Sequence, residues 1–472
     1  MGSTISSLGT SAGRKRKHSE CEDEDGSQTD EEAVVDVVKR KKLKGTCDYI
    51  YQTLFLDGEG SDVTIHALGK EWKLHRIYMC QSAYFQSMFN GSWKESTADH
   101  ITMEIPDENI DVEALNTAFG SLYCDEVMVS PVKVVPLLAA ANLLQLEGLS
   151  QQCAEAMIET INRATVCAYH AAATQYCETE VQAKCVKWLE RRLTSETSVS
   201  LLKEISVELM SEVVNSQELF VMQIEVDVYN LLKVWAYLHL HPNWEGSWKD
   251  VRAQSNTYFA SRATDSSMCF LETDEGRKFV PAFRAIRLHH VVNDIRSIQL
   301  LDTDRIIPQD WLHPVYKSQW VCMLSVSQNR DSSPSIDKFR TNALRCGRIL
   351  ERNSSYCWRW TGFSYGIDVI VTYSPRMRQL LLRRNTYTHP VSGAVCLHQQ
   401  KNIIVRVAAA SFDAKGCTSY YTCSGLLDLT LDPDEEKVVL QLDRSAVFPL
   451  SVSVHMAHVS CSATSIQSRD EH

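Results

Sequence analysis

The sequence lacks the close cysteine pairs that mark zinc-binding and redox proteins. None of its sixteen cysteines forms a C-x-x-C pair, and structural zinc sites usually take ligand pairs two to four residues apart. The N-terminus has no apolar signal-peptide core and runs into a basic cluster at 14–17 instead. A zinc finger, a RING domain and a secreted disulfide framework are therefore disfavoured, and the cysteines are expected to be reduced and mostly buried thiols.

Membrane and enzyme signatures are also missing. The longest apolar stretch, Val134 to Leu144, is broken by Pro136 and Asn142, and it falls short of the roughly 18 to 20 residues that span a bilayer. No G-x-x-x-x-G-K-[ST] or G-x-S-x-G motif occurs, and Gly58-Glu59-Gly60 lacks the third glycine of a dinucleotide fingerprint. The sequence predicts a non-catalytic protein with no transmembrane helix, cofactor or metal site.

Positive net charge is missing as well. The formal charge is −11 at pH 7, whereas a nucleic-acid-binding domain normally carries a basic stripe or patch. Direct nucleic-acid binding is therefore not expected. The 472 residues exceed the roughly 250–300 at which a single core stops growing, so several domains are predicted.

Residues 1–46 are built from alternating charge blocks and hold few large apolar side chains, which predicts a disordered tail. Nine Lys or Arg residues balance nine Asp or Glu residues over positions 1–47. The basic residues form two clusters of the kind that import receptors read, so the sequence predicts a nuclear protein. The expected import residues are Arg14, Lys15, Arg16, Lys17, Lys39, Arg40, Lys41, Lys42 and Lys44.

The same tail carries candidate modification sites. Its first six residues fit the pattern for myristoylation of Gly2. One acyl chain gives only marginal membrane affinity, so at most weak membrane association is expected. Ser19, Ser27 and Thr29 each have an acidic residue three positions later, which suits an acid-directed kinase.

Residues 47–150 have the pattern of one small α/β domain. A predicted helix over Tyr49–Leu56 is apolar on two faces, because Ile50 pairs with Leu54 and Tyr51 with Phe55 one turn apart. One monomer core can cover only one such face, so a homodimer is predicted. The other expected elements are a hairpin of Asp62–His66 and Trp72–His75 with its turn at 69–71, a helix over Arg76–Phe89, a strand over Ile101–Ile105, and helices over Val112–Leu122 and Val132–Leu146.

The rest of the chain divides by its periodicity. Residues 151–320 show helical spacing, 321–340 read as a linker, 341–458 show short strand patterns and 459–472 read as a second disordered tail. The predicted fold class is multidomain α+β, with an all-α middle domain and a mainly-β, sandwich-like or barrel-like C-terminal domain. The expected helices are Cys153–Ile161, Ala164–Tyr176, Val181–Leu193, Val199–Leu209 and Gln223–Leu240, and the expected strands are Ile367–Tyr373, Gln379–Arg383, Ala394–His398, Ile403–Ala408, Leu426–Leu431, Val438–Leu442 and Leu450–His455.

Two stretches resemble known domains. Ser61-Asp62-Val63, Leu74-His75-Arg76 and the segment 82–89 (SAYFQSMF) resemble the signature of the BTB/POZ domain. The segment 219–235 resembles the BACK domain that follows BTB in ubiquitin-ligase adaptors.

Over residues 40–455 the chain closely resembles the germ cell-less family. The stretches that carry the likeness are the myristoylation-like start, the basic run 39–44, YIYQTLFL at 49–56, GSWKES at 91–96 and YCWRWTGF at 356–363. This resemblance implies a BTB-BACK adaptor associated with the nuclear envelope and with germ-cell formation or spermatogenesis.

The resemblance also assigns candidate contact residues. In BTB proteins that recruit a cullin, a hydrophobic-x-Glu element follows the SxYF helix, and Trp93-Lys94-Glu95 occupies that place here. A plain loop is the alternative interpretation of this element. Tyr84 and Met88 are expected to be mostly core residues with one cullin contact between them. Four residues are assigned to the fold and the dimer seam: Asp62, His75, Tyr51 and Phe55. Asp62 is expected to be a buried carboxylate at a strand end.

These predictions lead to two hypotheses. In the first, the chain is a substrate-recruiting adaptor of a cullin-RING ubiquitin ligase, with its C-terminal domain capturing an unidentified target protein. In the second, it is a non-catalytic scaffold that clusters nuclear-envelope or transcription-factor partners through its BTB dimer. The two differ in whether Trp93 and Glu95 matter to function.

Overall fold

The computed structural model describes residues 45–91, 94–124, 127–196, 198–265, 268–292, 294–327, 339–361, 368–384, 401–413, 416–432 and 435–458. Contacts divide the chain into a unit of Met1–Thr46 and a unit of Cys47–His472. Trp93, Gly2, both basic clusters, the three candidate phosphorylation sites and the strand expected at Ala394–His398 lie outside the described residues.

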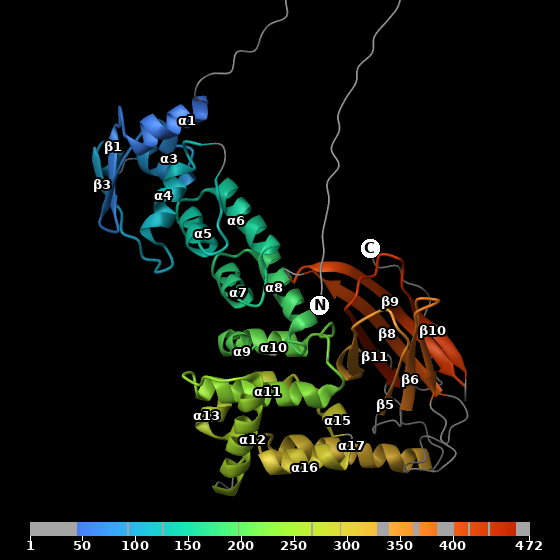
Figure 1. Cartoon of the computed structure of the whole chain (residues 1–472). Coiled ribbons are helices and arrows are strands. Elements are labelled where there is room, and N and C mark those ends of the chain that lie inside the picture. Colours follow the sequence, from blue (N-terminus) through green and yellow to red (C-terminus); the bar gives the residue numbers. More distant parts are fainter. Residues whose placement is uncertain are drawn as a thin grey trace, which may run out of the picture. The chain divides into compact units, whose positions relative to one another are not determined.

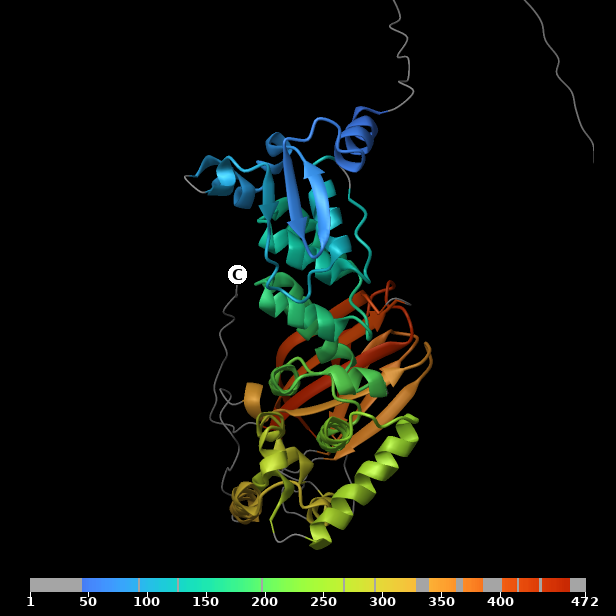
Figure 2. The same cartoon turned by 90° about the vertical axis from the view of Figure 1, so that its left-hand side faces the viewer.

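The first domain packs helices against one face of a small mixed sheet (Figure 2). The sheet order is β2-β1-β3, with β1 antiparallel to β2 and parallel to β3. Alternate residues of β1, among them Val63 and Ile65, face the buried core. The elements are α1 (Thr46–Ile50), η1 (Tyr51–Leu56), β1 (Val63–Ala67), β2 (Lys70–Leu74), α2 (Arg76–Met79), α3 (Ala83–Asn90), η2 (Lys94–Ser96), β3 (His100–Thr102), α4 (Val112–Gly120), α5 (Val134–Leu143) and α6 (Glu147–Glu159).

Local chemistry moves several element ends from their expected places. The hairpin turns at Leu68-Gly69, both with positive φ, as a two-residue turn between strands requires. The helix expected over 76–89 is two helices, because Ser82 is extended and its hydroxyl accepts from the Phe85 N–H to begin α3. Strand β3 ends at Thr102, which pairs with His66, one residue before the end of β1.

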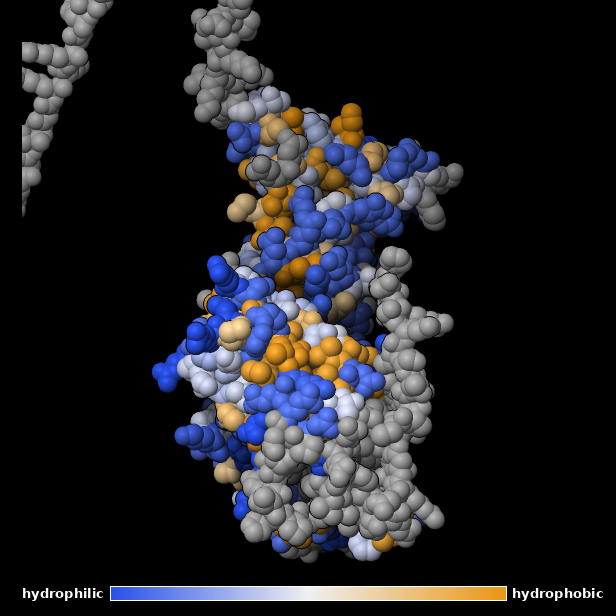
Figure 3. Space-filling view, turned by 90° about the vertical axis from the view of Figure 1, so that its right-hand side faces the viewer, coloured by the Kyte–Doolittle hydropathy of each residue, from blue (hydrophilic) through white to orange (hydrophobic). Residues whose placement is uncertain are grey.

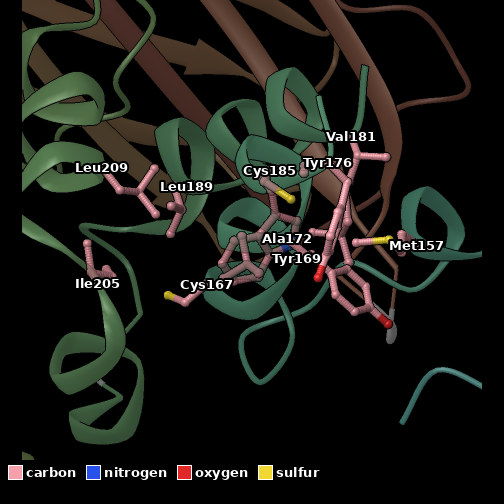
Figure 4. Close-up of a cluster of buried hydrophobic side chains, with 14 of the residues drawn as sticks. Met157, Cys167, Tyr169, Ala172, Tyr176, Val181, Cys185, Leu189, Ile205 and Leu209 are labelled. Carbon is pink, nitrogen blue, oxygen red and sulfur yellow. The ribbon is translucent and has the colours of Figure 1, made fainter. Parts of the chain in front are cut away.

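A helical block follows. Serine hydroxyls at 198 and 206 and the Asp294 carboxylate cap the starts of α9, α10 and α16. Figure 4 shows buried side chains of this block converging from α6, α7, α8 and the α9–α10 segment. The elements are α7 (Val166–Gln175), α8 (Thr179–Arg192), α9 (Val199–Glu204), α10 (Val207–Asn215), α11 (Glu225–Leu240), α12 (Trp248–Asp265), η3 (Phe270–Glu272), α13 (Asp274–Arg277), α14 (Val280–Arg284), α15 (Leu288–Val291), α16 (Ile295–Asp304) and α17 (Gln309–Ser327).

The C-terminal domain is a sandwich of two four-stranded antiparallel sheets, ordered β10-β7-β6-β5 and β4-β11-β8-β9 (Figure 1). Side chains of both sheets, such as Val371 and Val454, share one buried cluster. The sandwich rather than the barrel is therefore observed. After α18 (Phe339–Asn342) the strands are β4 (Leu344–Leu350), β5 (Tyr356–Thr361), β6 (Asp368–Ser374), β7 (Gln379–Arg384), β8 (Lys401–Phe412), β9 (Thr418–Leu431), β10 (Glu436–Gln441) and β11 (Leu450–His458).

The periodicity of the sequence does not predict β4, β5 or the first half of β9. Arg345 and Gly347 interrupt the apolar pattern of β4, and both serve a contact with the helical block that is described below. Helix α17 also runs to Ser327, six residues past the expected start of the linker at 321. The apolar residues Val321 and Leu324 lie exposed on this extension, and Trp320 is exposed just before it.

Candidate protein-interaction sites

The N-terminal helical segment has one covered face and one open face. Phe55 is buried, with its ring 5.2 Å from that of Tyr51 and 5.3 Å from that of Tyr123. A Cβ at Gly120 would lie 3.0 Å from the Phe55 ring, so glycine permits this close approach. Tyr49 and Leu56 remain 56% and 53% exposed on the single chain. The open side has the apolar character that a second protein surface would cover.

Asp62 is exposed in the single chain, and its burial at a dimer seam stays a prediction. Its Oδ1 accepts a 2.8 Å hydrogen bond from the Arg76 N–H at the start of α2. There the carboxylate satisfies a backbone donor that the helix leaves open, and it does not have to be desolvated to do so.

His75 is buried beside Asp62 and hydrogen-bonded through both ring nitrogens. Nδ1 lies 3.2 Å from the Tyr123 hydroxyl and Nε2 lies 2.9 Å from the Glu59 carbonyl. The His75 backbone N–H also donates to the Tyr123 hydroxyl at 2.9 Å. Burial is the main cause that raises the pKa of Tyr123 to about 12, so this hydroxyl keeps its proton. These contacts tie the end of β2 to the segment after α4.

The described part of the expected cullin-binding element is held against α3. Glu95 lies exposed in η2, and Tyr84 and Met88 are half-buried on α3. The Arg76 guanidinium donates to the carbonyls of Ser96 at 2.5 Å and Ala98 at 2.6 Å. Burial raises the pKa of Tyr84, and the charge of nearby Glu95 adds to the rise. Glu95 and Tyr84 therefore belong to one small surface, presented by a tethered segment.

A hollow lies next to this surface, between the helices of the first domain and α6. It has a volume of about 460 Å³ and is lined by Gln81, Leu122, Cys124, Leu146 and Leu149, among others. Its walls come from the α2–α3 turn, the segment after α4 and the first turns of α6.

The helical block and the sandwich meet through a buried ion pair that the sequence did not reveal. Glu225 at the start of α11 and Arg345 on β4 are both 0% exposed. The Arg345 Nε donates to Glu225 at 3.1 Å, and its Nη1 donates to the carbonyls of Val214 at 2.8 Å and Ser216 at 3.0 Å. The two residues lie 120 positions apart, so no local pattern links them. A buried pair of this kind is tolerated because its hydrogen bonds are satisfied.

The segment with BACK-like sequence supplies the backbone side of this junction. The Gln223 N–H donates to the Gly347 carbonyl on β4 at 3.0 Å. A Cβ at Gly347 would lie 2.6 Å from the Phe220 ring and 2.7 Å from the Val221 carbonyl oxygen. Glycine is therefore the residue that permits this contact. The first part of the segment is not helical and meets β4 through the single bridge between Gln223 and Gly347, and α11 starts only at Glu225.

A second buried pair lies within the helical block. Lys233 of α11 donates to Asp304 of α16 at 2.8 Å, and the Tyr229 hydroxyl donates to the same carboxylate oxygen at 2.9 Å. Lys233 and Asp304 are 1% and 3% exposed. The two donors satisfy a carboxylate inside the core.

The sandwich presents apolar residues at its surface. Met377, Leu426, Val438 and Val447 are all exposed on it. Figure 3 shows one face on which a compact apolar patch is bordered by hydrophilic side chains. Exposed apolar patches of this kind are common at protein interaction sites.

Two kinds of feature are absent from the described ranges. Over those residues, no group of three or more His, Cys, Asp or Glu side chains is placed to hold a metal ion. Over the same residues, no helix combines the length and apolar character needed to cross a bilayer.

Comparisons with known proteins agree with this architecture. Residues 51–161 match the family model described as the BTB/POZ domain, which defines the chain as a BTB-domain protein. It is 46% identical to human "Germ cell-less protein-like 1" over 436 residues, 91% of this chain and 84% of the relative. It is 34% identical to Drosophila melanogaster "Protein germ cell-less" over 474 residues, 94% of this chain and 82% of the relative.

The chain belongs to the germ cell-less family. A weaker likeness, 25% over 175 residues and 37% of this chain, links it to mouse "Kelch-like protein 17". The resemblance stated from the sequence and the multidomain α+β fold class are both confirmed.

Proposed function

We propose that this chain is a non-catalytic adaptor that dimerises through its BTB domain, binds a cullin beside α3 and captures a target protein with its sandwich. The observation that carries the proposal is the η2 segment. The Arg76 guanidinium holds it beside α3, where exposed Glu95 and half-buried Tyr84 share a surface. A preordered surface binds with a lower entropy cost than a free loop.

The roles within this surface differ. Trp93 is the proposed hydrophobic anchor and Glu95 the residue that orients the cullin, with Tyr84 and Met88 as flanking contacts. Aromatic anchors typically cost over about 2 kcal/mol when truncated, whereas rim charges cost less. The expected ranking is therefore Trp93 above Glu95.

Titration of the full chain with a cullin N-terminal fragment tests the proposal. Trp93→Ala should weaken binding by roughly 30-fold, since 1.4 kcal/mol corresponds to tenfold, and Glu95→Ala should weaken it by less. Glu71→Ala, an exposed carboxylate change on β2 of the same domain, serves as the control and should bind like wild type. If both test variants are folded and bind as tightly as wild type, the ligase hypothesis fails and the scaffold hypothesis replaces it.

Nuclear localisation and a role in germ-cell development complete the proposal. They rest on the two basic clusters of the tail and on the printed names of the relatives. Replacing the five basic residues of 39–44 by alanine should shift the full chain to the cytoplasm, as fluorescence imaging would show. Unchanged nuclear accumulation would instead assign import to residues 14–17 or to a partner.

A further inference from the structure

Three adjoining hollows follow the junction between the helical block and the sandwich. The first, about 430 Å³, is lined by Arg284, Arg287 and Arg340. The second, about 190 Å³, shares Arg287 and Arg340 with the first and adds Arg406 and Leu426. The third, about 280 Å³, shares Arg406 with the second and extends to α8. Neighbouring hollows share wall residues, and the three together are here called the junction groove.

Among the charged residues that line the junction groove, cations outnumber anions. Its described lining residues include six Lys or Arg and two Glu. Both glutamates lie toward the third hollow. Glu218 pairs with Arg406 at 2.6 Å, and burial raises the pKa of Glu190, so its carboxyl group binds a proton more readily than an exposed one. The first hollow has no acidic residue among its described lining residues.

Arg287 makes the first hollow electropositive from within. It is 7% exposed, and its guanidinium donates to the Ala343 carbonyl and, at 2.6 Å, to the Arg340 carbonyl. The Glu225 carboxylate accepts a 3.1 Å hydrogen bond from the Arg287 backbone N–H and is also paired with the Arg345 guanidinium. Burial and then the charge of Arg345 lower the pKa of Arg287 to about 9, so it stays protonated at neutral pH. A desolvated cation beside a second cation favours the entry of an anion.

The remaining wall residues suit a peptide. The Arg284 guanidinium lies 3.4 Å from the centroid of the Trp311 ring, which fixes its position at the rim. The exposed Asn215 and Gln217 side chains can hydrogen-bond a peptide backbone. Leu426 is 56% exposed at the second hollow and offers an apolar contact one step along the groove. Charge at one end and an apolar contact further along match an extended chain with acidic and apolar side chains.

We infer that the junction groove binds an extended acidic peptide of the target protein, with carboxylates at Arg284, Arg287 and Arg340 and an apolar side chain at Leu426. This inference rests on the proposed adaptor function and names the class of substrate segment that the adaptor recognises. The two walls come from different domains, so the groove exists only when the sandwich is joined to the helical block through Glu225 and Arg345.

Fluorescence anisotropy with a labelled synthetic Glu-Leu peptide and the full chain tests the inference. Wild type should bind, and Arg284→Glu combined with Arg340→Glu should weaken binding at least about tenfold. The matched control, Arg277→Glu combined with Arg296→Glu, makes the same charge change at exposed positions outside the groove and should bind like wild type. If melting curves show that the glutamate variant is unfolded, the Arg284→Gln, Arg340→Gln variant replaces it.

Other outcomes overturn the inference. Equal loss in the test and control pairs would mean a general charge effect. Tighter binding of a single-stranded RNA than of the peptide, or peptide binding only after deletion of residues 1–44, would assign the groove to nucleic acid or to the chain's own acidic block. The same variants are titrated with the cullin fragment in parallel. If a groove variant loses peptide binding but still binds cullin, the groove is separate from the proposed cullin surface. If the chain binds the peptide but not cullin, only the ligase hypothesis is contradicted.

Discussion

The first domain and the junction of the helical block with the sandwich are stabilised by different kinds of contact. In the first domain, neighbouring segments pair: β1 and β2 form a hairpin, and Ser82 caps the helix that follows it. At the junction, Glu225 and Arg345 meet from 120 positions apart and without access to water. Pairing between neighbouring segments produces an alternation that can be recognised in the sequence. A buried pair between distant residues appears in the sequence only as two charged residues.

A change to the buried ion pair at the junction should have the greatest effect on the free energy of unfolding. Arg345→Met removes one partner of the buried pair and leaves the Glu225 carboxylate uncompensated, which should lower the free energy of unfolding by about 3–5 kcal/mol. Arg348→Met, at an exposed position of the same strand, should change it by less than about 0.5 kcal/mol. Denaturant unfolding measures both. Similar values for the two variants would show that the pair does not hold the junction.

A backbone change at the same junction should have a smaller effect. The added Cβ in Gly347→Ala meets the Phe220 ring and the Val221 carbonyl oxygen, and such overpacking costs about 1–3 kcal/mol. Gly148→Ala is the control, since nothing lies within 4 Å of a Cβ at that helical position, and it should be neutral or slightly stabilising. Thermal melting would compare them, and a neutral Gly347→Ala would show that the two domains can move apart at no cost.

In the first domain, a charge placed on the exposed face of the N-terminal helical segment should disrupt the dimer and leave the fold stable. Leu56→Asp places a charge on the open face of the N-terminal helical segment, where the leucine is 53% exposed. It should convert a dimer to a monomer with little loss of monomer stability. Leu68→Asp, at the exposed hairpin turn, should leave the dimer intact. Sedimentation of the full chains distinguishes the results, and a wild-type monomer would remove the dimer hypothesis.

The difference between local and distant contacts also explains which elements could be predicted from the sequence. Alternation predicted the β1–β2 hairpin and most strands of the sandwich, because one face of each is buried. Alternation did not predict β4, because Arg345 and Gly347 interrupt its apolar pattern. Both residues form the contact with the helical block. The periodicity also did not predict that the Asp62 carboxylate accepts a hydrogen bond from the first N–H of α2. The junction groove could not be found from sequence at all, because its arginines converge only through the tertiary contacts of two domains.

The central claim is that a BTB dimer presents cullin-binding surfaces beside α3. The most direct measurement is the mass of the complex formed when the full 53.4 kDa chain is mixed with excess cullin N-terminal fragment, by sedimentation velocity. We expect a complex of two chains with one cullin fragment on each. With Trp93→Ala we expect the cullin fragments to be lost and the dimer to remain. A chain that sediments without the cullin fragment at tens of micromolar would contradict it.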